Sequence, residues 1–134
     1  MSIAYSIHDR IPVKIDSIEV KVSPLSYIQK AELQSEMISA SSGDMKAIMS
    51  AAFKAIKYAV KEVKGIKKRD GEDFVLEFDG IVLSDYCVNS ILNMEQTSKL
   101  TSVCAALLDG IPREITDPRT NLPLEGVEFN TPGK

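Results

Sequence analysis

The sequence predicts an α+β fold that is mainly α. Three patterns carry this prediction: an alternating apolar run near the N-terminus, four segments with helical periodicity, and an Asp-Gly pair between two extended runs. We expect a small helical domain of about four helices with an N-terminal strand or hairpin and a middle β-hairpin near residues 66–78. The length of 134 residues, with 44% hydrophobic and 26% charged side chains, fits one globular domain.

The N-terminal segment begins without a clear period, so residues 1–10 are expected to form a mobile arm. From Pro12 onward, apolar and charged residues alternate, which is typical of a half-buried strand. The phase slips once, at Asp16-Ser17, and this slip indicates either a bulge or a short turn between two strands. We favour the turn. The apolar positions of the alternation are Val13, Ile15, Ile18, Val20 and Val22.

Two helices are expected next. The first follows Ser23-Pro24, because proline suits the first helical turn, and it extends to about Ala40. The second is the clearest element of the sequence, with Asp44 as its N-cap and Gly65 as its stop. Its apolar residues recur at spacings of three and four: Ile48, Met49, Ala52, Phe53, Ile56, Val60 and Val63.

The middle hairpin is predicted from Asp70-Gly71, which separates the runs 66–69 and 74–78. Two shorter helices then follow at about 85–94 and 98–109. Ser84 is the expected N-cap of the first and Thr97 that of the second, and Gly110 ends the pair.

Residues 1–110 are therefore expected to form the globular domain, and residues 111–134 an extended C-terminal tail. The tail holds four of the six prolines, which excludes a long helix. It is nevertheless too apolar for a solvated linker, so we expect it to dock, either on its own domain or on another chain. The candidate docking residues are Leu122, Leu124, Val127 and Phe129.

Positive charge is concentrated in residues 46–69, which carry eight basic residues and one acidic residue. On the expected second helix, five lysines form one continuous ridge. A solvated helix face explains such a ridge, and so does a head-to-tail contact with the acidic residues 70–134 of a second copy. Nucleic acid is a less favoured partner, because the net charge is −3 and no set of stacking aromatics accompanies the ridge. The five lysines are Lys54, Lys57, Lys61, Lys64 and Lys68.

Enzyme chemistry is not expected. The sequence lacks the common nucleotide-binding, hydrolase and metal-binding motifs, and its one histidine, His8, lies in the N-terminal arm. Cys87 and Cys104 lie among apolar residues and are expected to be buried, reduced thiols. We therefore expect no catalytic residues, no cofactor and no metal. The chain also has no apolar run long enough for a bilayer and no secretory signal, so a cytoplasmic protein is expected.

The order of elements resembles a known family. An alternating strand ends in the segment 18–27 (IEVKVSPLSY), a small helical body follows, and the chain closes with the segment 117–129 (DPRTNLPLEGVEF). This layout resembles the tail assembly chaperones of long-tailed, lambda-like bacteriophages. The resemblance implies a non-enzymatic protein that self-associates, coats the tape measure protein and recruits tail tube protein. It also implies a protein that works in the host bacterial cytoplasm and is missing from the mature virion.

Two other functions stay open. One is a different tail structural or completion protein of a phage, and the other is a small nucleic-acid-binding regulator that uses the basic helix of residues 46–69. Four methionines bear on the chaperone hypothesis, because their adaptable side chains suit a binding surface as well as ordinary core filling. They are Met37, Met45, Met49 and Met94.

Overall fold

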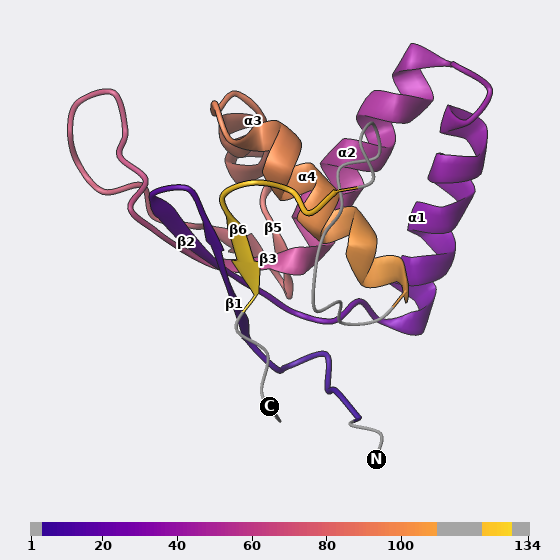
Figure 1. The fold of residues 1–134 in the computed structure, drawn as a ribbon, viewed down its shortest axis with the longest axis horizontal. Helices are drawn as coiled ribbons and strands as arrows, with labels where there is room; N and C mark the ends of the chain where they lie inside the picture. The colour runs from indigo at the N-terminus through magenta and orange to yellow at the C-terminus, as the bar shows by residue number, and fades with distance from the viewer. Residues whose placement is uncertain (1–3, 110–121, 130–134) are drawn as a thin grey trace.

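The fold has two layers: helices pack on one face of a four-stranded antiparallel sheet (Figure 1). The computed structural model describes residues 4–109 and 122–129. The strand order is β3-β2-β1-β6, and a separate two-stranded sheet pairs β4 with β5. The strands are β1 (Ile11–Ile15), β2 (Ile18–Val22), β3 (Val60–Lys64), β4 (Phe78–Asp79), β5 (Val82–Leu83) and β6 (Val127–Phe129). The helices are α1 (Tyr27–Ala40), α2 (Met45–Ala59), α3 (Asp85–Leu92), α4 (Thr97–Ala106) and the 3-10 turn η1 (Leu107–Asp109).

The N-terminal alternation forms the β1–β2 hairpin, in which Val13 lies opposite Val20. Asp16 and Ser17 connect the strands, and the φ of Asp16 is 53°, so the phase slip is the expected turn. Because side chains alternate between the faces of a strand, all the apolar residues of the hairpin point toward the helices. The buried residues are Ile11, Val13, Ile15, Ile18, Val20 and Val22.

The expectation of a mainly α domain is wrong. Of the described residues, 44% are helical and 21% lie in strands, which form one four-stranded and one two-stranded sheet. The error arises at Val60 and Val63, whose spacing also fits a helix. The helix instead ends at Ala59, and Val60 begins β3 beside β2. β-branched residues favour a strand, and the edge of the β1–β2 hairpin supplies its hydrogen-bonding partner.

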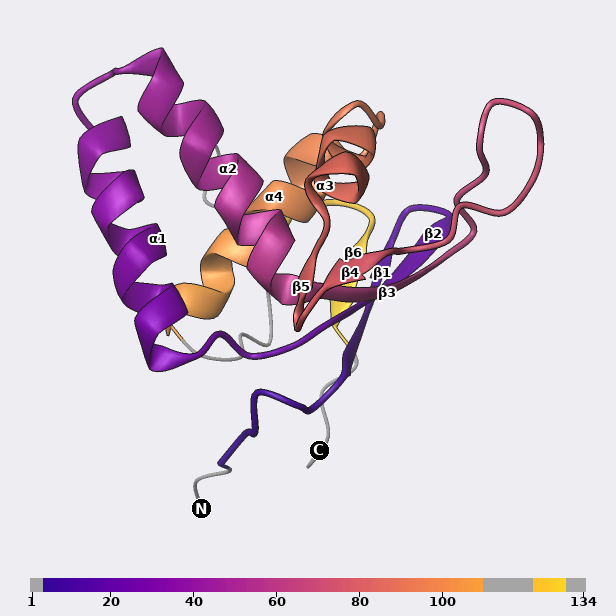
Figure 2. The ribbon, with the colours of Figure 1, turned by 180° about the vertical axis from the view of Figure 1, so that it is seen from behind.

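Of the expected middle hairpin near residues 66–78, the chain reversal at Asp70-Gly71 forms, but the extended strands do not. Among the described residues of this stretch, the pairing is one isolated bridge between Lys67 and Asp73, and the segment projects from the body as a loop (Figure 2). A hairpin with two strands joins β4 to β5, slightly later in the chain, with Phe78 opposite Leu83. Gly80 takes a positive φ of 71° in its turn, which glycine adopts at little cost.

The four α-helices lie close to their expected positions, and three begin at side-chain caps. Ser26 and Gln29 form a reciprocal capping box at α1, Asp44 accepts from the backbone N–H of Lys46 at α2, and Ser84 caps α3. The expected cap at Thr97 is wrong. Gln96 precedes α4 without a side-chain cap, and the Thr97 hydroxyl donates to the Ile91 carbonyl at 2.7 Å.

The two ends of the described chain lie on the body. Tyr5 packs against the core, although residues 1–10 were expected to form an arm. Near the other end, β6 pairs with β1 and so joins the sheet. Residues 111–121 and 130–134 of the expected tail lie outside the described residues.

One hydrophobic core lies between the inward face of the sheet and the helices. The buried residues of α2, α3 and α4 meet those of β1 and β2 there. Across residues 4–109 and 122–129, no helix combines the length and the apolar character that crossing a membrane requires.

Candidate functional site

The five ridge lysines do not lie on one helix. Lys54 and Lys57 belong to α2, Lys61 and Lys64 belong to β3, and Lys68 follows in the loop. Residues three apart share a helix face but point to opposite faces of a strand. Lys61 is accordingly buried, with 9% of its surface exposed, whereas Lys64 is exposed. The structure therefore removes the continuous helical ridge on which the nucleic-acid alternative depended.

Four of the five lysines have partners within the chain. Lys54 forms an ion pair with Glu36 at 2.7 Å, Lys57 pairs with Asp85, and the Lys61 ammonium donates to the Ile81 carbonyl. The fourth is Lys68, which lies within 4 Å of two acidic side chains, those of Asp70 and Glu72. Among residues 4–109 and 122–129, Lys64 is the one ridge lysine with neither a hydrogen-bond nor an ion-pair partner. Because these lysines already have partners within the chain, the structure weakens the hypothesis that they bind the acidic residues of a second copy in a head-to-tail oligomer.

The candidate residues of the tail divide between the core and the surface. Leu124 and Val127 are partly buried against the core of their own domain. Leu122 is a large exposed hydrophobic residue. Phe129 pairs with Val13 through its backbone, and its side chain lies outside the described atoms. The described part of the tail therefore docks in cis.

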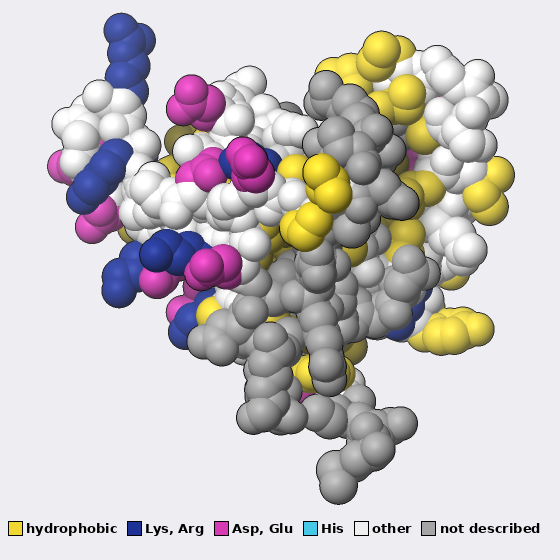
Figure 3. All heavy atoms as spheres, viewed as in Figure 1, with side chains coloured by type: hydrophobic (Ala, Val, Ile, Leu, Met, Phe, Trp, Pro, Cys, Tyr) yellow, Lys and Arg dark blue, Asp and Glu magenta, His cyan; other side chains and the backbone are white. Residues whose placement is uncertain are grey.

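Seven large apolar side chains of the α1–α2 hairpin are exposed, and together we call them the hairpin surface. Figure 3 shows hydrophobic side chains over this part of the molecule. Ile38 at the end of α1 is 67% exposed, and Met45 and Met49 in the first turns of α2 are each 65% exposed. Exposed apolar residues that gather on one part of a protein indicate an interaction site, whereas single exposed apolar residues do not. The hairpin surface consists of Tyr27, Ile28, Met37, Ile38, Met45, Ile48 and Met49.

The hairpin surface exists because α1 is anchored by few side chains. Leu33 is the only fully buried residue of this 14-residue helix. Two polar contacts across the hairpin supplement it: the ion pair between Lys54 and Glu36 and a hydrogen bond from the Tyr58 hydroxyl to Glu32. Burial and the Glu32 carboxylate together raise the pKa of Tyr58 to about 12. The helix is thus held on one side and leaves its other faces exposed.

The helix α2 supplies the rest of the hairpin surface by extending beyond the body. With 15 residues it is about 22 Å long. Its apolar stripe continues from the buried Ile56 through Ala52 to Met49 and Met45, at spacings of four, three and four. The C-terminal half of this stripe packs in the core, whereas the N-terminal half is exposed. An apolar stripe that continues past its own core is a docking face for another apolar element.

A groove beside the hairpin surface separates α1 from the end of α4. Its volume is about 320 Å³. Tyr27 and Met37 line its α1 side, and Ala105 and Leu108 line the opposite side. Apolar residues on two facing helices are the usual lining of a groove that receives a third helix.

The hairpin surface was only partly visible in the sequence. Met37, Met45 and Met49 are exposed as the hypothesis of an adaptable surface requires, whereas Met94 is partly buried against the core. Ile28, Leu33 and Ile38 follow one another along α1 at spacings of five residues. Steps of five residues turn a helix by about 140°, so the three side chains point in different directions. That irregular spacing was the available signal that α1 exposes apolar residues.

The titratable side chains of the described residues form no cluster suited to metal binding. No group of three or more His, Cys, Asp or Glu side chains within residues 4–109 and 122–129 could hold a metal ion. Cys87 and Cys104 are free and buried, as expected, and burial raises the pKa of Cys104 to about 12. The Cys104 thiol is therefore protonated in the folded protein at neutral pH.

Comparison with family models, curated proteins and solved structures finds no match for this chain. The surfaces of the described residues are what indicates a function, and the hairpin surface is the most distinctive of them.

Proposed function

We propose that this protein is a tail assembly chaperone of a long-tailed bacteriophage and that the hairpin surface binds the tape measure protein. The observation that carries the proposal is the exposure of seven large apolar side chains on one helical hairpin. A protein that keeps a long apolar helix from aggregating needs such a surface, because its client presents a periodic apolar face. The layout of the chain, which resembles this family, supports the same function.

The chemistry of the hairpin surface suits a client of varied sequence. Three of its seven members are methionines, whose unbranched and polarizable side chains adapt to different partners. Burying one such side chain completely contributes about 1.5–3 kcal/mol. A single copy therefore binds one stretch of helix with modest affinity, and many copies along one tape measure protein add their contacts. Modest affinity per copy also permits displacement when the tube forms.

The remaining parts of the proposal follow the same function. The protein recruits tail tube protein to the coated client and contacts further copies of itself. It acts in the host bacterial cytoplasm and is missing from the finished virion. Finding the chain in purified virions would favour the alternative of a tail structural or completion protein.

Co-expression with the tape measure protein tests the proposal. The wild-type chain is expected to raise the soluble fraction of the client, and the paired variant Met45→Ser with Met49→Ser is expected to lose this effect. Each lost apolar contact weakens binding about tenfold or more. Because both side chains are exposed, the free energy of unfolding should change by only about 0.5 kcal/mol.

The matched control is Val75→Ser. Val75 is also an exposed apolar residue, but it lies in the loop that follows β3, outside the hairpin surface. This variant should solubilise the client as the wild type does. Equal loss in the control and the paired variant, or no solubilisation by the wild type, would contradict the proposal.

A further inference from the structure

A second groove, which shares no residue with the hairpin surface, lies between the N-terminal segment, β3 and the β4–β5 turn. Its volume is about 530 Å³. Two features distinguish it from the other surfaces described above: cationic side chains from two different elements line it, and exposed apolar side chains surround them. We call it the cationic groove, and the residues that carry the argument are Ile7, His8, Arg10, Lys61, Phe78 and Ile81.

Lys61 is a buried cation without a counter-charge. Its ammonium donates to the Ile81 carbonyl, and an ammonium has three hydrogens to donate. No acidic side chain pairs with it in residues 4–109 or 122–129. Buried charges are costly unless they are paired, and lysine is almost never buried unless it has a partner. An acceptor with a negative charge would satisfy this group.

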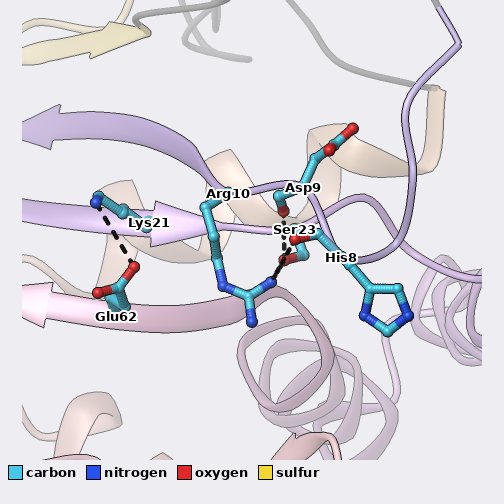
Figure 4. A network of polar contacts seen from close by, with 6 residues as sticks. All are labelled: His8, Asp9, Arg10, Lys21, Ser23 and Glu62. Carbon is cyan, nitrogen blue, oxygen red and sulfur yellow. Dashed lines mark hydrogen bonds and ion pairs between the residues drawn. The ribbon is translucent and has the colours of Figure 1, made fainter.

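Arg10 is fixed beside it by hydrogen bonds. Its Nη1 donates to the Ser23 hydroxyl oxygen at 2.8 Å and to the His8 carbonyl at 3.0 Å. The Ser23 hydroxyl in turn donates to the Asp9 carbonyl at 2.7 Å. Figure 4 shows the guanidinium held at one terminal nitrogen by Ser23, with the other terminal nitrogen pointing away from Ser23. The described residues supply no acceptor for that second nitrogen.

The charges that face the groove leave a cationic excess. The N-terminal segment contributes Arg10, and β3 contributes Lys61 and Glu62. Glu62 is already paired with Lys21, at 3.6 Å (Figure 4). The β4–β5 turn contributes no charged side chain to the lining. Burial lowers the pKa of Lys61 and the nearby Arg10 lowers it further, as expected for two cations with no anion between them.

We propose that the cationic groove binds an acidic peptide segment, with one carboxylate between Arg10 and Lys61. A guanidinium and an ammonium together offer the charge-assisted hydrogen bonds that a carboxylate accepts. The three exposed apolar side chains of Ile7, Phe78 and Ile81 fit the apolar neighbours of that acidic residue. Such a rim favours a peptide over a nucleic acid, whose sugar–phosphate backbone offers no comparable apolar groups. This binding site goes beyond the proposed chaperone function.

A pair of blocked synthetic peptides tests the inference on the full chain. The acidic probe is Ac-Gly-Ile-Asp-Phe-Gly-amide, and the neutral probe replaces its Asp with Asn. NMR titration should show saturable shifts of the Arg10 Nε–H signal and of the Ile7 and Ile81 methyl signals. We expect the acidic peptide to bind about tenfold more tightly or better, and less so as salt is added.

Variants then separate the groove from general attraction to a cationic protein. Arg10→Gln should weaken binding of the acidic peptide about tenfold or more. Lys64→Gln removes an exposed cation from β3, the strand that carries Lys61, and should leave binding unchanged. If Arg10→Gln does not fold, the comparison of the acidic and neutral peptides on the wild-type chain still tests whether the cationic groove binds a carboxylate.

Three outcomes would overturn the inference. The first is equal binding of the acidic and neutral peptides, and the second is equal weakening by Arg10→Gln and Lys64→Gln. The third is that inorganic phosphate or a short DNA duplex shifts the same signals at lower concentration than the acidic peptide does.

Discussion

Lys61 combines a charged side chain with a strand position that faces the core, and its titration should affect stability. Because its pKa is lowered from 10.5, the folded protein binds fewer protons at this group than the unfolded chain does at pH values just below 10.5. Stability from this group therefore rises with pH in that window. Tyr58 acts in the opposite direction above about pH 10, since its pKa is raised to about 12.

The expected result is a loss of this alkaline rise in Lys61→Met. Urea unfolding at about pH 7 and about pH 9.5 measures the difference in the free energy of unfolding. Cys104 and Tyr58, whose raised pKa values act in the opposite direction, are present in both proteins, so their contribution cancels when the variant is compared with the wild type. Lys64→Met is the matched control, because it removes an exposed lysine from the same strand. If Lys61→Met and the wild type gain the same stability between the two pH values, the described burial of Lys61 is contradicted.

Single residues also show why part of the candidate site could not be predicted. The exposure of Ile38 and Met45 depends on where the body ends, which the local sequence does not encode. Apolar periodicity identifies a face suitable for packing, but it does not say whether an intramolecular partner covers that face. Lys61 is a similar case, because its burial follows from a strand assignment that the helical spacing of its neighbours concealed.

Among the elements, the α1–α2 hairpin is stabilised by the ion pair between Lys54 and Glu36, which acid should weaken. The hydrogen bond from Lys54 is the main cause that holds the pKa of Glu36 below 4.5. The stability that this contact contributes is present above 4.5 and is lost as the pH falls through the lowered pKa.

Replacing Glu36 by Gln should therefore make stability less sensitive to acid. Thermal unfolding followed by circular dichroism, between about pH 6 and about pH 3, should show a smaller fall in Tm for Glu36→Gln than for the wild type. Glu95→Gln is the control, because Glu95 is exposed and forms no ion pair in the described structure. An identical acid response of the wild type and Glu36→Gln would contradict the role of this contact.

The strand β6 is held against the β1–β2 turn by a close approach at Gly126. The backbone N–H of Asp16 donates to the Gly126 carbonyl at 2.7 Å, and the Asp16 carboxylate accepts from Lys99 at 2.8 Å. Gly126 has a φ of 77°, and a Cβ there would lie 2.1 Å from Asp16 Oδ1. Alanine would thus meet a backbone penalty and displace an anchored side chain.

We expect Gly126→Ala to lower the free energy of unfolding more than Gly71→Ala does. Gly71 has a similar φ of 91° but open space at the Cβ position, so its substitution costs only the backbone term of about 1–2 kcal/mol. The clash and the lost Asp16 contact should add about 1–3 kcal/mol to Gly126→Ala. Urea unfolding of both variants measures the difference, and equal losses would show that β6 does not dock as described.

Elements that depend on neighbouring residues could be predicted from the sequence, whereas elements that depend on long-range pairing could not. The caps at Asp44 and Ser84 and the turn at Asp16 depend on neighbouring residues, and all three were predictable. The strand assignment of Val60 depends on pairing with a hairpin nearly forty residues earlier. Its spacing with Val63 fits a helix equally well, so tertiary pairing overrides the local pattern.

At the scale of the whole molecule, the surfaces differ in kind. The sheet turns an exposed polar face outward, with Lys14, Glu19 and Lys21 among its residues. The helical hairpin on the other side exposes apolar residues beyond the reach of the core. We interpret this asymmetry as a division of labour in which the sheet and α3–α4 form the scaffold and the α1–α2 hairpin presents the binding surface.

Hydrogen exchange of this chain, alone and in complex with the tape measure protein, tests that interpretation most directly. Binding should slow exchange across α1 and the N-terminal half of α2, since a docked client helix would restrict local opening of a weakly anchored hairpin. Residues 66–77, in the projecting loop, should exchange at the same rate in both samples. Slowed exchange confined to that loop, or no change in α1 and α2 under conditions where the complex forms, would contradict the account.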